Sequence, residues 1–129
     1  MKVTVKHINS GIPTKDHEFF NNFIRFLQKE IPLNNDVIVL FLGEKTEKMS
    51  TGSRNKNSVL KILSKNRMNR DICRTLAHEW VHEHQFSVLN RQVGPDIGGK
   101  NENEANSKAG VLVKTYEKEN PKKEPKMYE

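Results

Sequence analysis

The chain has 129 residues, of which 34% are hydrophobic, and its formal net charge is +6. This length supports one small domain with a modest core and excludes a second domain of ordinary size. No apolar run is long enough to cross a membrane and no N-terminal secretory signal is evident, so we expect a cytoplasmic protein without a membrane partner. The single cysteine, Cys73, excludes an intrachain disulfide and indicates a reducing compartment.

The positive charge raises the question of nucleic-acid binding, because clustered basic side chains release counterions from phosphates. Most basic residues here are dispersed along the chain. Some form one loose cluster before and at the start of the long predicted helix, and this cluster contains no interleaved aromatic residues that would stack on bases. A solvated basic face is therefore favoured over a nucleic-acid site, and we expect a monomer. The cluster consists of Arg54, Lys56, Lys61, Lys65, Arg67, Arg70 and Arg74.

The first third of the chain predicts a strand, a helix and a second strand. Residues 2–8 alternate polar and apolar side chains, which is typical of a half-buried strand. Residues 14–31 carry apolar side chains at helical spacing until Pro32 ends the pattern. Residues 37–42 form a continuous apolar run, which indicates a buried central strand.

The middle of the chain predicts a loop, a strand and a long helix. Residues 44–57 are polar and indicate a surface loop, and residues 59–63 are short, apolar and partly β-branched, which favours a strand. A helix is expected over residues 69–89. The glycines and the proline of residues 90–100 then predict a second loop.

The last part of the chain predicts a helix and a tail. A helix over residues 101–117 would carry an apolar stripe, whereas residues 118–129 are charged and interrupted by prolines, so we expect a disordered tail there. The predicted fold is thus an α+β domain over residues 1–117 with a small mixed sheet. The stripe consists of Ala105, Ala109, Leu112, Val113 and Tyr116.

The segment Thr-Leu-Ala-His-Glu-Trp-Val-His at residues 75–82 places chemistry on the long predicted helix. His78 and His82 are four residues apart, so their Cβ atoms would lie about 6 Å apart on one face, close enough to share a metal. Neutral imidazole suits zinc, and a catalytic zinc lowers the pKa of its water to about 7. Glu79 could then accept a proton from that water.

A bare pair of histidines on a helix is more often a surface or core feature than a metal site. The apolar residues on both sides of this motif, however, predict a helix buried on most of its faces. Two histidines and a glutamate in such a helix are costly without a partner, and a metal ion would provide one.

A catalytic zinc needs a third protein ligand from a neighbouring element. Glu104 is the best candidate, because it follows the glycine-rich loop and lies beside Ala105, which would let its helix pack closely. Glu102 is the nearest competitor, and Glu104 could also be only the first-turn glutamate of its helix. His84 is excluded, because residues two apart on a helix point about 200° apart.

The motif segment, followed by Glu-Asn-Glu-Ala-Asn at residues 102–106, resembles the zincin metallopeptidases and in particular the gluzincins. It is most similar to the small ImmA/IrrE-type peptidases, and the resemblance covers about residues 59–116. It implies a Zn²⁺-dependent peptidase with a protein or peptide substrate. The strand at residues 59–63 stands just before the motif helix, as the zincin edge strand does, and extended substrate peptides lie along that edge strand in zincins.

By this resemblance, His78, His82 and Glu104 would bind zinc. Glu79 would be the general base that later passes its proton to the leaving amine. The sequence does not identify the group that would stabilise the negative charge developing on the substrate oxygen. The candidates for it are Tyr116, His7, His17 and His84.

Two departures from the family pattern support a different hypothesis. Zincins usually have a small or apolar residue after the second histidine, where this chain has Glu83 and His84. Thermolysin-like gluzincins place an aspartate four residues after the glutamate ligand to orient the first histidine, and here Lys108 stands four residues after Glu104. The alternative is a basic nucleic-acid or protein binding module with a structural or inactive zinc site.

Overall fold

A mixed sheet of four strands lies in the part of the chain that the computed structural model describes, namely residues 1–46, 49–91 and 99–129. The strands stand in the order β1-β2-β4-β3, and β2 pairs in parallel with both β1 and β4. β3 runs antiparallel to β4 at one edge. The expected small mixed sheet is confirmed. Its strands are β1 (Val3–Ile8), β2 (Val37–Leu42), β3 (Gly52–Arg54) and β4 (Val59–Leu63).

One face of the sheet carries the core. In the register, Val39 of β2 stands opposite Val5 of β1 and Leu60 of β4, so these three side chains share a face. Val39 and Leu60 are fully buried. The continuous apolar run therefore became a central strand, because β2 has a hydrogen-bonded neighbour on each side.

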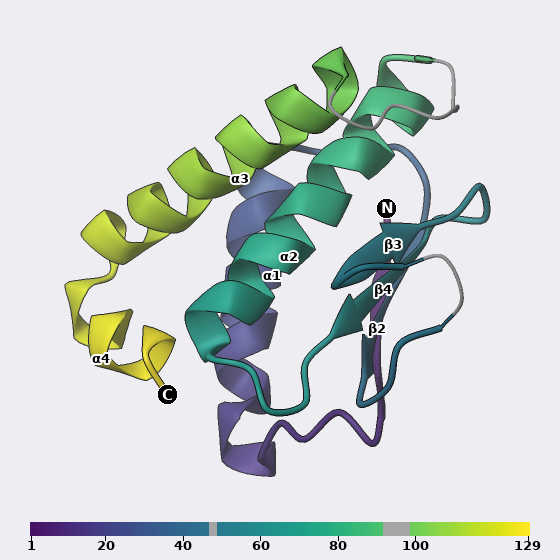
Figure 1. Cartoon of the computed structure of the whole chain (residues 1–129). Helices are drawn as coiled ribbons and strands as arrows, with labels where there is room; N and C mark the ends of the chain where they lie inside the picture. Colours follow the sequence, from purple (N-terminus) through teal and green to yellow (C-terminus); the bar gives the residue numbers. More distant parts are fainter. Residues whose placement is uncertain (47–48, 92–98) are drawn as a thin grey trace.

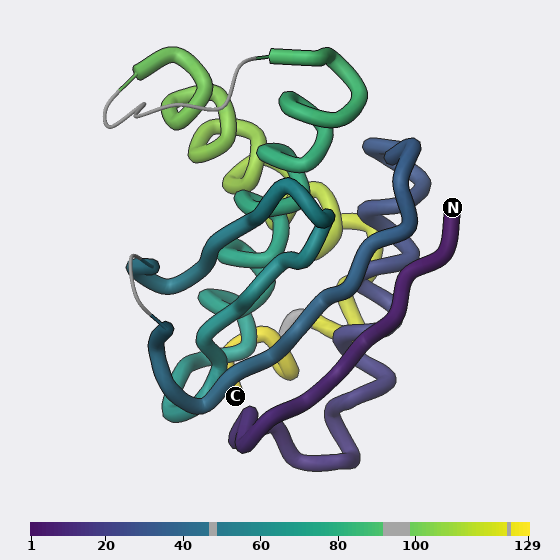
Figure 2. The backbone as a smooth tube through the Cα atoms, turned by 90° about the vertical axis from the view of Figure 1, so that its right-hand side faces the viewer, coloured from purple at the N-terminus to yellow at the C-terminus, as the bar shows by residue number. Residues whose placement is uncertain are grey.

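The helices lie together on the other side of that core (Figure 1). The view in Figure 2 shows the opposite face of the sheet in front of them. α2 packs on β3 and β4 as well as on α1 and α3, and Leu76, Ala77 and Trp80 of α2 are fully buried. None of the described helices has the length and apolar character needed to cross a membrane. The helices are α1 (His17–Glu30), α2 (Asn69–Glu83), α3 (Lys100–Glu119) and the short α4 (Glu124–Met127).

The long predicted helix changes its winding near its end. α2 stops at Glu83 and continues as a π-helical turn, η2 (His84–Val88), in which the Leu89 N–H donates to the His84 carbonyl at 3.0 Å. Such wide turns are often found at functional sites, because the additional residue redirects side chains.

The segment predicted as a surface loop over residues 44–57 contains strand β3. This strand has no hydrophobic pattern, and it forms because it pairs with β4. As a consequence, β4 is an interior strand, and β3 rather than residues 59–63 is the edge next to α2.

The expectation of a disordered tail is corrected by the structure. α3 continues to Glu119, and the chain then turns through η3 (Pro121–Lys123) into α4. Met127 is fully buried, and the Lys126 ammonium lies 2.7 Å from the buried Asp16 carboxylate. The Glu129 carbonyl accepts a hydrogen bond from the first N–H of α2, at Asn69. One apolar anchor and these polar contacts hold a segment whose composition predicts disorder.

Candidate metal centre

Two imidazole rings on α2 face the same point. His78 and His82 lie one helical turn apart, and their Nε2 atoms are 3.1 Å from each other. The rings are nearly perpendicular, at 86°, with their centroids 4.6 Å apart. Both side chains are largely buried, with 16% and 11% of their surface exposed. The helix thus brings two ring nitrogens to one place.

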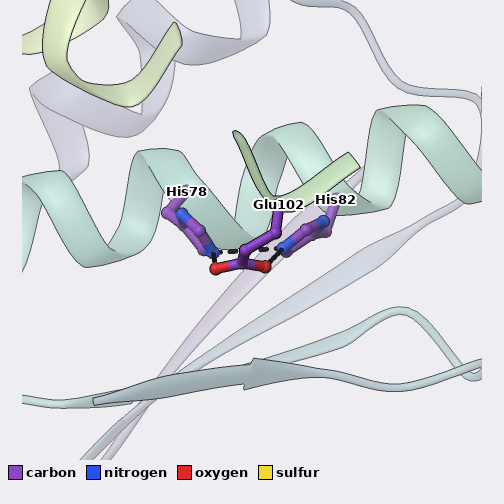
Figure 3. Close-up of side chains that lie close together, drawn as sticks. All are labelled: His78, His82 and Glu102. Atoms are coloured by element: carbon purple, nitrogen blue, oxygen red, sulfur yellow. Dashed lines mark hydrogen bonds and ion pairs between the residues drawn. The ribbon is translucent and has the colours of Figure 1, made fainter. Parts of the chain in front are cut away.

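Glu102, in the first turn of α3, completes the group (Figure 3). Its Oε1 lies 3.0 Å from His78 Nε2, and its Oε2 lies 2.9 Å from His82 Nε2. α3 can approach α2 this closely because small residues, Ala105 and Ala109, are fully buried on α3. Among the described residues, His78, His82 and Glu102 form a group that could hold a metal ion.

The donor atoms of this group fit a bound cation. Two nitrogen lone pairs and a carboxylate repel one another at 2.9 to 3.1 Å unless a proton or a cation lies between them. Around a tetrahedral ion with bonds of about 2.0–2.1 Å, ligand atoms stand about 3.3 Å apart. The observed separations differ from this by only a few tenths of an ångström.

Glu104 does not belong to the group, which corrects the prediction that it is the third ligand. Its Oε1 accepts hydrogen bonds from Arg91 at 3.0 Å and from Gln85 at 3.1 Å, and the Lys108 ammonium lies 3.8 Å away. Residues two apart on a helix point about 200° apart, so α3 can present only one of its two glutamates to the histidines. The structure places Glu102 there.

Hydrogen bonds behind the rings fix their orientation. The Gln85 amide nitrogen donates to the Asn101 carbonyl at 3.0 Å, so its oxygen faces His82 and accepts from Nδ1 at 2.8 Å. An acceptor at Nδ1 favours a proton on that nitrogen of His82 and leaves the lone pair of Nε2 for a cation bound between the ring and Glu102. Asn106, four residues after Glu102, hydrogen-bonds to the His78 side chain.

Glu79 lies beside the first histidine in a dry environment. Its side chain is buried, and its Oε2 is 3.9 Å from His78 Nε2. Burial, together with the negative charge of Glu102, raises the pKa of Glu79 to about 8. Burial also lowers the pKa of His78, against the opposing effect of the Glu102 charge. A carboxyl group with such a shift is a candidate for proton transfer near neutral pH.

The edge strand β3 passes directly over Glu79. A Cβ atom at Gly52 would stand 2.7 Å from Thr75 Cγ2 and 3.0 Å from Glu79 Cγ, which is closer than van der Waals contact allows. Glycine therefore permits the close approach of strand and helix at this point.

Glu83, which departs from the family pattern, has a structural partner. It is fully buried, and its carboxylate accepts hydrogen bonds from Arg54 Nε at 2.7 Å and from the Ser58 hydroxyl at 2.8 Å. The Arg54 guanidinium also lies over the Phe86 ring, which stacks on His82. These contacts tie β3 to the helix that carries the histidines.

The other candidates from the sequence lie outside the three-residue group. Tyr116 is core, packed edge-on against Phe23, and burial raises its pKa to about 12. His7 and His17 stack on each other with centroids 3.9 Å apart. Burial lowers the pKa of His84, which the charge of Lys108 lowers further.

Comparisons of the chain with protein-family models, with curated proteins and with solved structures found no match. Its function must be inferred from the site itself. That site consists of two histidines and a glutamate that converge from two helices, with a buried carboxyl group beside them.

Reasoning from sequence missed Gln85 and Asn106, although the helical period contains a signal for both. Gln85 stands three residues after His82, and Asn106 stands four residues after Glu102, so each lies on the same helix face as its partner. The same period, counted back from Ala105 on the apolar stripe, selects Glu102 rather than Glu104.

Proposed function

We propose that the chain is a zinc-dependent metallopeptidase that hydrolyses peptide bonds of a protein or peptide, and that its domain is zincin-like. The observation that carries this proposal is the convergence of His78, His82 and Glu102 beside the buried Glu79. Two histidines and one glutamate are a known ligand set of catalytic zinc. Structural zinc sites use four protein ligands, whereas the group in the described residues has three.

Each residue of the site has a role in this reaction. His78, His82 and Glu102 would hold the metal through their ring nitrogens and carboxylate. Zinc, when bound, supplies a Lewis acid for the peptide carbonyl and acidifies water. Glu79 accepts the proton of the attacking water and passes it to the leaving amine. A cation nearby favours the ionised form of Glu79, which burial alone disfavours.

The edge strand β3 offers a place for an extended substrate. Thr51 and Asn55, on either side of β3, hydrogen-bond to Leu63 and Val59 through their backbones. Because these bonds alternate along an antiparallel pair, the backbone groups of Gly52 and Arg54 point away from β4. A peptide that adds to this edge would pass beside Glu79.

The metal site is tested by elemental analysis of the chain purified without a histidine tag. We expect one zinc per chain in the wild type and a marked loss in Glu102→Ala. Glu18→Ala, which removes an exposed glutamate paired with Arg25 on α1, should keep the metal. A wild type that binds no zinc, even after zinc is added, would overturn the proposal.

The catalytic role of Glu79 is tested by Glu79→Gln. This variant should keep its zinc and lose activity in a peptide-library cleavage assay by about 10²-fold or more, since general acid–base groups contribute about 10² to 10⁴. Full activity in Glu79→Gln would exclude this mechanism. Salt-sensitive binding of DNA or RNA without cleavage of any peptide would favour the binding-module alternative.

Two features that supported this alternative are accounted for by contacts within the domain. Glu83 pairs with Arg54 and Ser58, and it therefore stabilises the contact between β3 and α2. With Glu102 in the ligand position, the residue four positions later is Asn106, which hydrogen-bonds to the first histidine. The net charge of +6 is the remaining support.

A further inference from the structure

A fully buried amide lies directly behind one of the candidate ligands. Gln85, in the π-helical turn η2, has no exposed surface, yet both of its polar atoms are hydrogen-bonded. Its oxygen accepts from His82 Nδ1 at 2.8 Å, and its nitrogen donates to the Asn101 carbonyl at 3.0 Å and to Glu104 at 3.1 Å. Burying an amide is costly unless it is satisfied in this way.

The Glu104 carboxylate is in turn held by basic side chains. Arg91 donates one N–H to Glu104 Oε1 at 3.0 Å and a second to Oε2 at 3.4 Å. The same arginine donates to the Asn101 side chain at 3.0 Å. Because charge-assisted pairs of this kind are directional, Glu104 has a defined place from which to orient Gln85.

We propose that Gln85 and Glu104 are positioning residues that hold His82 in the Nδ1-protonated form and thereby prepare its Nε2 to bind the metal. This inference rests on the metal-binding part of the proposed function and needs no peptidase activity. The Glu102 carboxylate, 2.9 Å from Nε2, competes for the same proton, so without an acceptor at Nδ1 the ring would place its proton on Nε2, which would block the ligand atom. Glu104 thus has a role in the site although it does not contact the metal position.

The first measurement is the tautomer of His82 in the metal-free protein, from long-range ¹H–¹⁵N NMR spectra at one fixed pH. Because Glu102 competes for the proton at Nε2, we expect a larger share of the Nδ1–H form in the wild type than in variants that lack the acceptor at Nδ1. Gln85→Leu, which keeps the bulk but removes the acceptor, should shift His82 toward the Nε2–H form. Glu104→Ala should shift it in the same direction and to a smaller extent.

The second measurement is the zinc dissociation constant, from competition with a chelator. Gln85→Leu should weaken zinc binding by about 10- to 100-fold, as is usual when a hydrogen bond to a ligand histidine is lost.

Unchanged zinc affinity and an unchanged tautomer in Gln85→Leu would overturn the inference. If Gln85→Leu does not fold, the inference is tested with Glu104→Ala instead. A His82 tautomer unchanged from the wild type in Glu104→Ala would contradict the role of Glu104. Failure of the proposed function has a different signature, since the wild type would then bind no zinc while the tautomer shift between variants persists. Glu18→Ala is the matched control, with both properties expected to be unchanged.

Discussion

Gly52 and Gly110 differ in what an added methyl group would meet. A Cβ atom at Gly52 lies 2.7 Å from Thr75 Cγ2, whereas the nearest atom to one at Gly110 is an Arg74 nitrogen at 3.9 Å. Gly52→Ala should therefore destabilise the protein by about 1–3 kcal/mol through overpacking. Gly110→Ala, inside α3, should stabilise it by about 0.5–1 kcal/mol because alanine favours the helix. Urea unfolding measures both effects.

The same contact gives Gly52→Ala a second expected effect. The added methyl group displaces Glu79, whose Cγ lies 3.0 Å from the Cβ position, so the proposed peptidase activity should fall in Gly52→Ala and be kept in Gly110→Ala. Equal stabilities of the two variants would show that β3 does not approach α2 as closely as described.

For single residues, the sequence predicts the histidine pair better than its partner. The spacing of His78 and His82 depends only on the period of one helix. The choice between Glu102 and Glu104 depends on how α3 is rotated against α2, which is a property of packing between elements. The apolar stripe that includes Ala105 indicates which face of α3 packs inward. Extending that stripe by one turn toward the N-terminus of the helix leads to Glu102 and not to Glu104.

At the scale of elements, the buried pair of Arg54 and Glu83 connects the edge strand to the histidine helix. The Arg54 side chain is 7% exposed, and the Glu83 side chain is fully buried. Glu83→Ala would leave the arginine charge buried without its partner, so the protein should lose about 3–5 kcal/mol of stability. The exposed pair of Glu18 and Arg25 is the control, and Glu18→Ala should cost about 0–1 kcal/mol.

The site of this loss can be located by hydrogen exchange. If the ion pair holds β3 on α2, the amides of β3 should exchange faster in Glu83→Ala than those of β2. A uniform change over all strands would mean that the pair supports the core in general and not the edge strand in particular.

The elements that the sequence predicts well are those with a strong period or a long apolar run. α1 and β2 belong to this class, with Phe20 and Val39 buried as their patterns require. β3 does not, since Gly-Ser-Arg has no pattern of its own and becomes a strand only through β4 and the Glu83 contact. Such an element depends on tertiary contacts, which local propensity does not contain.

At the scale of the whole molecule, the C-terminal segment closes the fold near the start of α2. Met127 has no exposed surface, whereas its neighbour Tyr128 is 54% exposed. Met127→Ala should therefore lower the free energy of unfolding by about 2–5 kcal/mol, and Tyr128→Ala should leave it within about 0.5 kcal/mol. Composition alone predicts disorder for this segment, because one buried methionine has little weight among so many charged residues. Urea unfolding of both variants in parallel separates order from disorder here.

The stacked histidines of β1 and α1 should make the stability of the whole molecule depend on pH. His7 stacks on His17 with an angle of 2° between the rings, and its Nδ1 lies 2.9 Å from the Ser10 hydroxyl oxygen. Burial, and then the charge of His17, lower the pKa of His7 from 6.5.

Below about pH 6.5, His7 binds a proton in the unfolded chain but not in the folded protein. The free energy of unfolding therefore falls as the pH drops from 6.5 toward the pKa of His7 in the folded protein. Above about pH 6.5, His7 is neutral in both states and this loss of stability is absent. Unfolding in urea between pH 5 and 8, with a chelator to exclude metal linkage, should show a steeper acid loss in the wild type than in His7→Gln. Parallel curves would mean that His7 titrates alike in both states.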